Sequence, residues 1–456
     1  MKTPKNGARG YRPLAVLVCG LATTGALAQQ GTLFPPSIAI TNYDHVLIGE
    51  EEALEAGAFV ARVGSTTAGW YNPAGMMLVK KTAIGASGTG YEADLIKLEG
   101  LTKAVGGGIS IAQLPSYFGA VLGDDVLHSD VWRFGFSITK PVSWAQGIEA
   151  GQPQQSASYS STVSLTTLVP MLSAAFAPLP CLRFGVGVGV ALTSLNEIQT
   201  LSAQALTDTT ANAFLRTVNA NGSIWNLTGN VGAQFDITKN LVVGAMVRLP
   251  GLKLLSSGGL TYQDVENNGA PWNQVFFKDR EASFDYKLPT EVDFGLAWQS
   301  NVFGVEADVR YHTAVANYLL LSSQNPVQTT TTAPNGTPIV TSTPFPGVTN
   351  GAKQVWNWAV GANVSVNEWW SLHAGFFSDY SPSDAASVSL FRNLNLYGTT
   401  LGAKVKGEHL SGSFGFGFTW GNSPNFTFPN SASGGTTTTR FVVRSIELLY
   451  ALAYKF

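Results

Sequence analysis

The sequence is poor in charge and cysteine, and beyond its N-terminal region it has no long apolar run. Charged residues make up 12% of the 456 residues, about half of the ~25% usual in soluble domains. The formal net charge of −2 comes without a basic patch, so we do not expect nucleic acid as a partner. No later apolar run reaches the roughly 20 residues that a membrane-spanning helix requires. These absences argue against a helical membrane protein.

Residues 1–28 have the layout of a secretory signal peptide. Four basic residues precede an apolar core from Leu14 to Leu21, and Ala26-Leu27-Ala28 is a small-x-small cleavage site. Cleavage would remove Cys19 and leave Cys181 as the single cysteine, so we expect no intrachain disulfide.

Apolar residues alternate with small or polar residues along many segments of roughly ten residues, the length of a tilted membrane-spanning strand. In 183–192, Phe184 and the valines that follow it alternate with Arg183 and three glycines. The C-terminal stretch "RSIELLYALAYKF" has the same period of two, which is typical of strands with one apolar face. The secretion signal, the strand length and aromatic residues at strand ends favour a barrel with apolar residues facing lipid over a soluble barrel. Because lipid satisfies no backbone group, such a barrel must be closed.

We therefore predict an all-β fold, a transmembrane antiparallel β-barrel of about 14 strands within residues 81–456. The expected strands lie near 81–91, 108–119, 131–144, 157–178, 182–195, 224–237, 240–253, 281–298, 302–313, 353–366, 369–378, 396–405, 412–421 and 443–456. Tight links alternate from the fourth strand onward with long links at 196–223, 254–280, 314–352, 379–395 and 422–442. Outer-membrane barrels have short periplasmic turns and long outer loops, so we expect both termini in the periplasm. Loosely helical spacing in 196–223 is compatible with a small external helix.

Residues 29–80 lack the strand pattern and combine helical stretches with turns. A barrel of this size is wide enough to leave an opening, and such barrels are commonly plugged. We predict a partly helical hatch in the lumen, with Trp70, Tyr71, Met76 and Met77 packing inside it.

The stretch "STTAGWYNPAGMMLVKKTAIGASGTGYEAD" resembles the opening of the FadL-type family of outer-membrane transporters for long-chain fatty acids and other hydrophobic compounds. The family hallmark is an Asn-Pro-Ala in the hatch just before the first strand, matched here by Asn72, Pro73 and Ala74, with Gly75 following. "WNLTGNVGAQFDITKNLVVGAMVRLPGLKL" resembles strands six and seven, "YKLPTEVDFGLAWQS" strand eight, and "VWNWAVGANVSVNEWWSLHAGFFSDYSPSD" the hairpin of strands ten and eleven. The resemblance covers essentially the whole mature chain.

The resemblance implies passive uptake across a bacterial outer membrane, with long-chain fatty acids as the expected cargo. Two outer loops, 196–223 and 254–280, would form a capture groove, and a gate at Asn72, Pro73, Ala74 and Gly75 would control passage. Cargo would leave sideways where the third strand kinks. Gly135 and Pro141 are the kink candidates, because glycine packs poorly and proline cannot donate to a ladder. An aromatic-hydrocarbon transporter, and a polar-solute porin or structural outer-membrane protein, remain alternatives.

The C-terminal strand ends on Tyr454 and Phe456, which resembles the signal read by the barrel-assembly machinery. We expect a monomer in contact with outer-membrane lipid and lipopolysaccharide.

No pattern indicates catalysis, a metal or a cofactor. The chain has no G-x-x-x-x-G-K-[ST], H-E-x-x-H or G-x-S-x-G sequence. Glu291, Asp293, Glu306 and Asp308 could serve acid–base chemistry, but we interpret them as polar lining of the lumen. A buried cation would favour a carboxylate cargo, and the candidates are Arg183, Arg248, Arg310 and Lys287. We expect no enzyme.

Overall fold

The computed structural model describes Ile38 and residues 40–456, apart from 99–102, 107–108, 111–114, 153–156, 207–210, 269–272, Pro334, 385–392 and 430–435. The predicted signal peptide lies outside the described residues. Among the residues described, no helix has the length and apolar character to cross a membrane.

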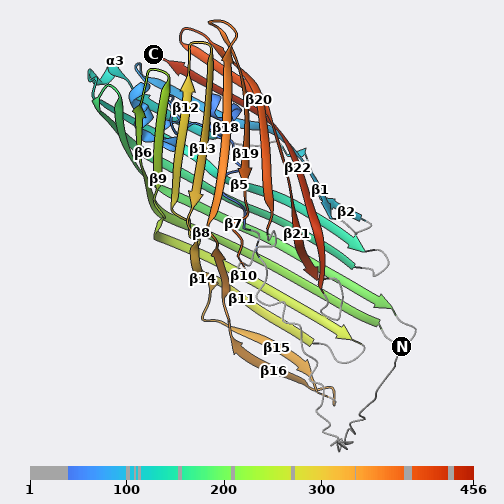
Figure 1. Ribbon diagram of the computed structural model, residues 1–456. Helices are drawn as coiled ribbons and strands as arrows, with labels where there is room; N and C mark the ends of the chain where they lie inside the picture. The colour runs from blue at the N-terminus through green and yellow to red at the C-terminus, as the bar shows by residue number, and fades with distance from the viewer. Residues whose placement is uncertain are drawn as a thin grey trace, which may run out of the picture.

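An antiparallel barrel forms most of the structure (Figure 1). Its wall consists of β1 (Ala83–Leu98), β4 (Pro115–Leu122) with the short β2 (Lys103–Gly106) and β3 (Ile109–Ser110), β5 (Trp132–Gln152), β6 (Ala157–Leu179), β7 (Leu182–Leu206), β8 (Ala211–Asp236), β9 (Leu241–Arg248) continued by β10 (Leu252–Asn268), β11 (Asn273–Phe284) continued by β12 (Glu291–Gln299), β13 (Phe303–His312) continued by β14 (Val315–Ser322), β17 (Val348–Ala352) continued by β18 (Val355–Ser365), β19 (Trp370–Asp379), β20 (Asn395–Lys406), β21 (Leu410–Pro429) and β22 (Thr436–Lys455). The hairpin of β15 (Pro326–Thr332) and β16 (Pro338–Pro344) follows β14, and helix α3 (Asp124–Leu127) follows β4.

The last strand closes the barrel on the first. β22 pairs with β1 from Lys455 opposite Ala83 to Phe441 opposite Leu98. Counted over the described residues, the segments make 14 wall strands, so the predicted closed all-β barrel is confirmed. The tight turns predicted between β6 and β7, β8 and β9, β12 and β13, and β18 and β19 are also present.

The barrel wall is apolar outside and polar inside. On β13, Phe303 and Val309 are exposed on the outer face, whereas Glu306 and Asp308 are buried on the inner face. This is the inverse of a soluble barrel, and it is the arrangement that a lipid-facing wall requires.

Several strands continue far beyond a membrane-spanning length. β7 has 25 residues and β8 has 26, against the roughly 9–11 that cross a bilayer. The two form one long hairpin, in which Leu195 lies opposite Gly222 and Leu206 opposite Ala211 (green in Figure 1).

The long loops predicted at 196–223 and 254–280, and the small helix in the first, are therefore wrong in the described residues. The period of two continues through these segments, with Leu201, Phe214 and Val218 buried in one hydrophobic cluster. We call the part of β6, β7, β8 and β10 at and beyond the paired row Leu165, Leu195, Gly222 and Gly258 the strand extension. Much of its outer face is polar, so its composition resembles that of a loop.

The apolar face changes sides along the strands. On β6, the exposed residues are Ser158, Ser160 and Ser164 in the extension, and Leu168 and Leu172 nearer the β6–β7 turn. The buried residues of the extension include Tyr159, Val163 and Leu165. Along β6, the extension therefore has the polarity of a soluble sheet, and the remainder of the strand has that of a membrane barrel.

Two predicted strands are interrupted. Leu249, Pro250 and Gly251 separate β9 from β10, and residues 285–290, which include Leu288 and Pro289, separate β11 from β12. Proline has no amide N–H to contribute to a ladder, which explains an interruption at each site.

Residues 40–79, here called the N-terminal segment, lie inside the barrel (blue in Figure 1). The segment contains α1 (Glu51–Leu54), α2 (Ala68–Tyr71) and the 3-10 helix η1 (Pro73–Leu78). Wall side chains reach its backbone from distant strands: Asn230 Nδ2 donates to Gly69 O at 3.0 Å and Thr400 Oγ1 to Leu54 O at 2.7 Å. Action as a hatch stays a prediction.

Charged side chains also join the segment to the wall. Arg62 is buried and pairs with Glu55 of the segment, and its Nε donates to Glu306 Oε2 of β13 at 3.0 Å. His373 Nδ1 of β19 lies 2.6 Å from Glu55 Oε1. Buried charges are tolerated when they are paired in this way.

Inward glycines let the segment's backbone approach the wall. A Cβ on Gly185 would lie 2.3 Å from Pro73 C, and one on Gly232 would lie 2.1 Å from Asn72 Oδ1. Neither distance is physically allowed, so Gly185 of β7 and Gly232 of β8 leave the space that this segment occupies.

Candidate ligand-binding site

Asn72 organises the turn between α2 and η1. It ends α2 in an extended conformation, with φ −163° and ψ 104°, as expected for a residue before proline. Its Oδ1 accepts from Ala74 N at 3.2 Å and so caps η1, whose first residue is Pro73. Proline at that position has no amide to satisfy, and asparagine is a favoured cap.

The amide of the same side chain fixes this turn to the wall. Asn72 Nδ2 faces Val60 O at 2.8 Å, Ala233 O of β8 at 3.0 Å and Ala245 O of β9 at 3.3 Å. Asn72 and Ala74 have no exposed surface. Gly75 is equally constrained, because a Cβ there would lie 2.1 Å from Val63 O. The four residues of the predicted gate thus form one buried turn against β7, β8 and β9.

The aromatic residues before this turn and the methionines after it belong to one hydrophobic cluster. Tyr71 Oη donates to Ile48 O at 2.8 Å. Met76 is fully buried, whereas Met77 is partly buried at the edge of the cluster. Trp70 and Tyr71 also line a cavity.

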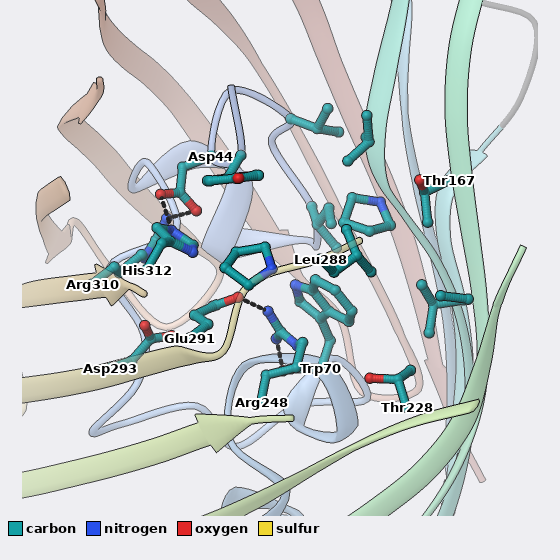
Figure 2. Close-up of a pocket in the computed structure, with 18 of the residues that line it drawn as sticks. Asp44, Trp70, Thr167, Thr228, Arg248, Leu288, Glu291, Asp293, Arg310 and His312 are labelled. Atoms are coloured by element: carbon teal, nitrogen blue, oxygen red, sulfur yellow. Dashed lines mark hydrogen bonds and ion pairs between the residues drawn. The ribbon is translucent and has the colours of Figure 1, made fainter. Parts of the chain in front are cut away.

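The cavity encloses about 880 Å³, including its open part, between the N-terminal segment and the wall. Its apolar side includes Val142, Val169, Ala191, Leu249 and Leu288. Figure 2 shows Trp70 and Leu288 between a charged side and the strands that carry Thr167 and Thr228. The interruptions after β9 and β11 supply Leu249, Leu288 and Pro289, so they shape this cavity directly.

One end of the charged side is built around Asp44. His312 Nε2 lies 2.8 Å from Asp44 Oδ2, and Arg310 Nη1 lies 3.7 Å from Asp44 Oδ1. Burial alone would raise the pKa of Asp44, but His312 and Arg310 outweigh it and hold that pKa well below its usual range. Asp44 is therefore an anion at neutral pH.

The other end is built around Arg248. Its guanidinium pairs with Glu291, its Nη2 donates to Trp70 O at 2.9 Å, and its Cζ lies 3.6 Å from the centre of the Trp70 ring. The ring thus covers one face of the cation, in a cation–π contact.

The structure shows which of the four cations considered as partners of a carboxylate cargo line the cavity. Arg248 and Arg310 line the cavity, whereas Arg183 pairs with Asp236 elsewhere on the wall. The side chain of Lys287 is 49% exposed and lies 3.8 Å from Asp285. The sequence did not predict the pairing of Asp44 with His312, because 268 residues separate the two.

The two candidates for a kink in the third strand, Gly135 and Pro141, differ in their strand pairing. β5 pairs regularly at Gly135, opposite Ser173 and Val121, and its register with β6 shifts between Thr139 and Val142. The irregularity therefore falls at Lys140 and Pro141. Pro141 lines the cavity, whereas a Cβ on Gly135 would meet Met76 Sδ at 2.8 Å. A lateral exit at this place stays a prediction.

Tyr454 and Phe456 lie on the outer surface with 40% and 54% of their areas exposed. Phe456 N donates to Thr82 O at 2.9 Å, next to the closure of the barrel. Recognition of these residues during assembly stays a prediction. Within the described part of the chain, no group of three or more His, Cys, Asp or Glu side chains is placed to hold a metal ion.

The fold and the cavity define a closed β-barrel with an apolar exterior and an N-terminal segment in its lumen. A FadL homologue of Pseudomonas aeruginosa is similar, with a TM-score of 0.61 and 15% identity over 91% of this chain and 100% of that chain. The Pseudomonas putida toluene transporter TodX has a TM-score of 0.56 and 16% sequence identity, over 92% of this chain and 100% of that chain. The Ralstonia pickettii toluene transporter TbuX has a TM-score of 0.54 and 14% sequence identity, over 90% of this chain and 98% of that chain.

No protein-family model matches this sequence, and no curated protein matches it. The structural matches establish that the chain has the FadL-type barrel fold, so the recognition made from the sequence is confirmed at the level of the fold.

Proposed function

We propose that the protein is a bacterial outer-membrane channel for the passive uptake of hydrophobic compounds. The observation that carries this proposal is the cavity of about 880 Å³, apolar on one side, within a barrel whose outer wall is apolar. Binding pockets for small hydrophobic molecules have this composition, a mostly apolar lining with a few polar groups.

The position of the N-terminal segment supports a gated route. The buried turn from Asn72 to Gly75 abuts the wall beside the cavity, and Pro141 lines the cavity where the β5–β6 register shifts. Cargo would enter from the strand extension, bind beside Trp70, and leave sideways near Pro141 after the turn has moved. Such a site must release its cargo as well as bind it, so binding is expected to be moderate.

We further propose a monomer, embedded in outer-membrane lipid and lipopolysaccharide after assembly through its C-terminal strand, with both termini periplasmic. Long-chain fatty acids follow from the sequence resemblance, and aromatic hydrocarbons are the second class, because two similar structures are named toluene transporters. The charges of the cavity bear on this choice. No enzymatic step is part of the proposal.

Tryptophan fluorescence tests the proposal directly, because Trp70 lines the cavity. Titration of the purified barrel with oleate and with toluene should give a saturable change for at least one of them. Trp70→Phe should remove most of that change, whereas Trp369→Phe, at an exposed position in the β18–β19 turn, should not. The absence of saturable binding for both ligands, or the high single-channel conductance of a water-filled pore, would contradict the proposal.

A further inference from the structure

The charged groups of the cavity restrict its cargo more narrowly than its apolar surface does. We infer that the cavity accepts uncharged hydrophobic molecules and excludes carboxylates, so free fatty acids are not the cargo of this site. The inference rests on the proposed function and specifies the class of cargo.

The lining carries three carboxyl groups, on Asp44, Glu291 and Asp293, and two guanidiniums, on Arg248 and Arg310. Each positive group has a protein carboxylate beside it: Glu291 pairs with Arg248, and Asp44 lies against both Arg310 and His312. Among the described residues of the lining, a guest carboxylate therefore meets no cation that lacks a carboxylate partner.

Both guanidiniums are already engaged by the protein. Arg248 pairs with Glu291 and donates to Trp70 O, while the Trp70 ring covers its face. Arg310 lies against Asp44, and its Nη2 donates to Gly57 O at 2.6 Å. A guest carboxylate would therefore have to displace a protein carboxylate from one of them.

Among the described atoms of the lining, Asp293 Oδ1, Arg248 Nε and His312 Nδ1 are buried without a hydrogen-bond partner. The two nitrogens belong to side chains that already pair with Glu291 and Asp44, so Asp293 Oδ1 is the polar atom that a guest would meet outside those pairs. A guest carboxylate nearby would place two acceptors together with no donor between them. Burying an anion without a matched cation is strongly unfavourable. A hydrocarbon or an alcohol has no such penalty, and an alcohol hydroxyl could donate to Asp293.

Matched pairs of ligands separate charge from size. Toluene and benzoate, and dodecanol and dodecanoate, would be titrated into the full-length barrel in amphipol at pH 7.5, with the Trp70-dependent fluorescence as readout. The neutral member of each pair should bind at least tenfold more tightly than the carboxylate. Protonating the two acids at lower pH should narrow this difference.

A double substitution should weaken or remove the preference for the neutral ligand. Glu291→Gln with Asp293→Asn removes two carboxylates and frees Arg248, so affinity for dodecanoate should rise at least tenfold while that for dodecanol changes little. Glu281→Gln, at an exposed carboxylate on β11 outside the cavity lining, should leave both affinities unchanged.

The outcomes distinguish the two levels of the proposal. Equal or tighter binding of the carboxylates by the wild-type protein would overturn the exclusion of anions and leave the uptake function standing. Absence of Trp70-dependent binding for all four ligands would overturn the function, and the inference with it. The wild-type comparison gives this answer even if the double variant fails to fold.

Discussion

Asn72 connects the turn of the N-terminal segment to two wall strands at a single buried side chain. Asn72→Ala would leave three backbone carbonyls without its amide and Ala74 N without its oxygen. Unsatisfied buried groups cost roughly 1–3 kcal/mol, so we expect faster hydrogen exchange in residues 60–79 and an intact barrel. Asn240→Ala, in the exposed β8–β9 turn, is the matched control.

The same substitution combined with Pro73→Ala should change the uptake rate without preventing barrel assembly, which heat-modifiable gel migration would report. Unaltered uptake by this double variant would remove the gate role proposed for the turn.

Gly185 offers a test of close packing from the side of the wall. A Cβ there would lie 2.3 Å from Pro73 C and 2.4 Å from Ala74 N, both backbone atoms. Overpacking of this kind typically costs about 1–3 kcal/mol, so Gly185→Ala should make the N-terminal segment sensitive to protease. Gly147→Ala, a strand glycine with no atom within 4 Å of the added Cβ, should not. Equal protease resistance in both variants would show that the segment does not depend on this contact.

The residues of the site were only partly predictable from the sequence. The Asn-Pro turn and the inward row of Glu306, Asp308 and Arg310 follow from local patterns, a pre-proline residue and a period of two. The pairing of Asp44 with His312 does not, since no local signal links residues 268 positions apart. The choice among the four candidate cations depends on which strands meet at the cavity, and register between distant strands is not readable from spacing alone.

At the scale of elements, the beginning of the N-terminal segment is tied to β19 by a titratable contact. His45 Nδ1 lies 3.3 Å from Asp379 Oδ2, and burial would lower the pKa of His45, but the hydrogen bond and charge of Asp379 outweigh burial and raise it. A raised histidine pKa stabilises the folded contact fully below the ordinary value of 6.5 and ceases to do so as pH rises through the raised value. The contact should therefore weaken at alkaline pH.

Hydrogen exchange of residues 40–48 measures this effect. After correction for intrinsic exchange, protection should fall as pH rises above 6.5, the ordinary histidine value. His45→Asn should reduce the pH dependence, leaving only the part that comes from the Asp44–His312 pair, whereas His128→Asn, at an exposed histidine after α3, should retain it in full. A pH-independent protection in the wild-type chain would contradict the proposed role of His45.

The strands themselves were predicted well where they face lipid and poorly where they do not. In the membrane-like part of β6 and β7, outward Leu and Val residues alternate with small or polar ones, and this contrast identifies a strand. In the extension, outward Ser and Asn residues face water, so the composition resembles a loop. The breaks after β9 and β11 were also missed, because a proline within an apolar run is compatible with either a strand end or an interruption.

For the whole molecule, the change of apolar face along β6 defines where a membrane would begin. Ser160 is exposed on the outer face of the extension, and Leu172 is 63% exposed on the outer face of the wall. Lipid covering the apolar part would leave Ser160 in water and Leu172 in hydrocarbon, although both side chains project from the same strand. Single cysteines at these positions, in a Cys181→Ser background, report the difference by reaction with a charged maleimide.

In outer-membrane vesicles, Ser160→Cys should react readily and Leu172→Cys should be protected at least tenfold, with the difference removed by denaturation in detergent. In intact cells, reaction at Ser160→Cys would place the extension outside the cell, as both termini in the periplasm require. Equal reaction at the two positions in vesicles would mean that lipid does not cover the apolar wall, and the membrane assignment would fail. The cavity lies beside the base of this extension, so the same result would also contradict the proposal that cargo enters the cavity from the extension.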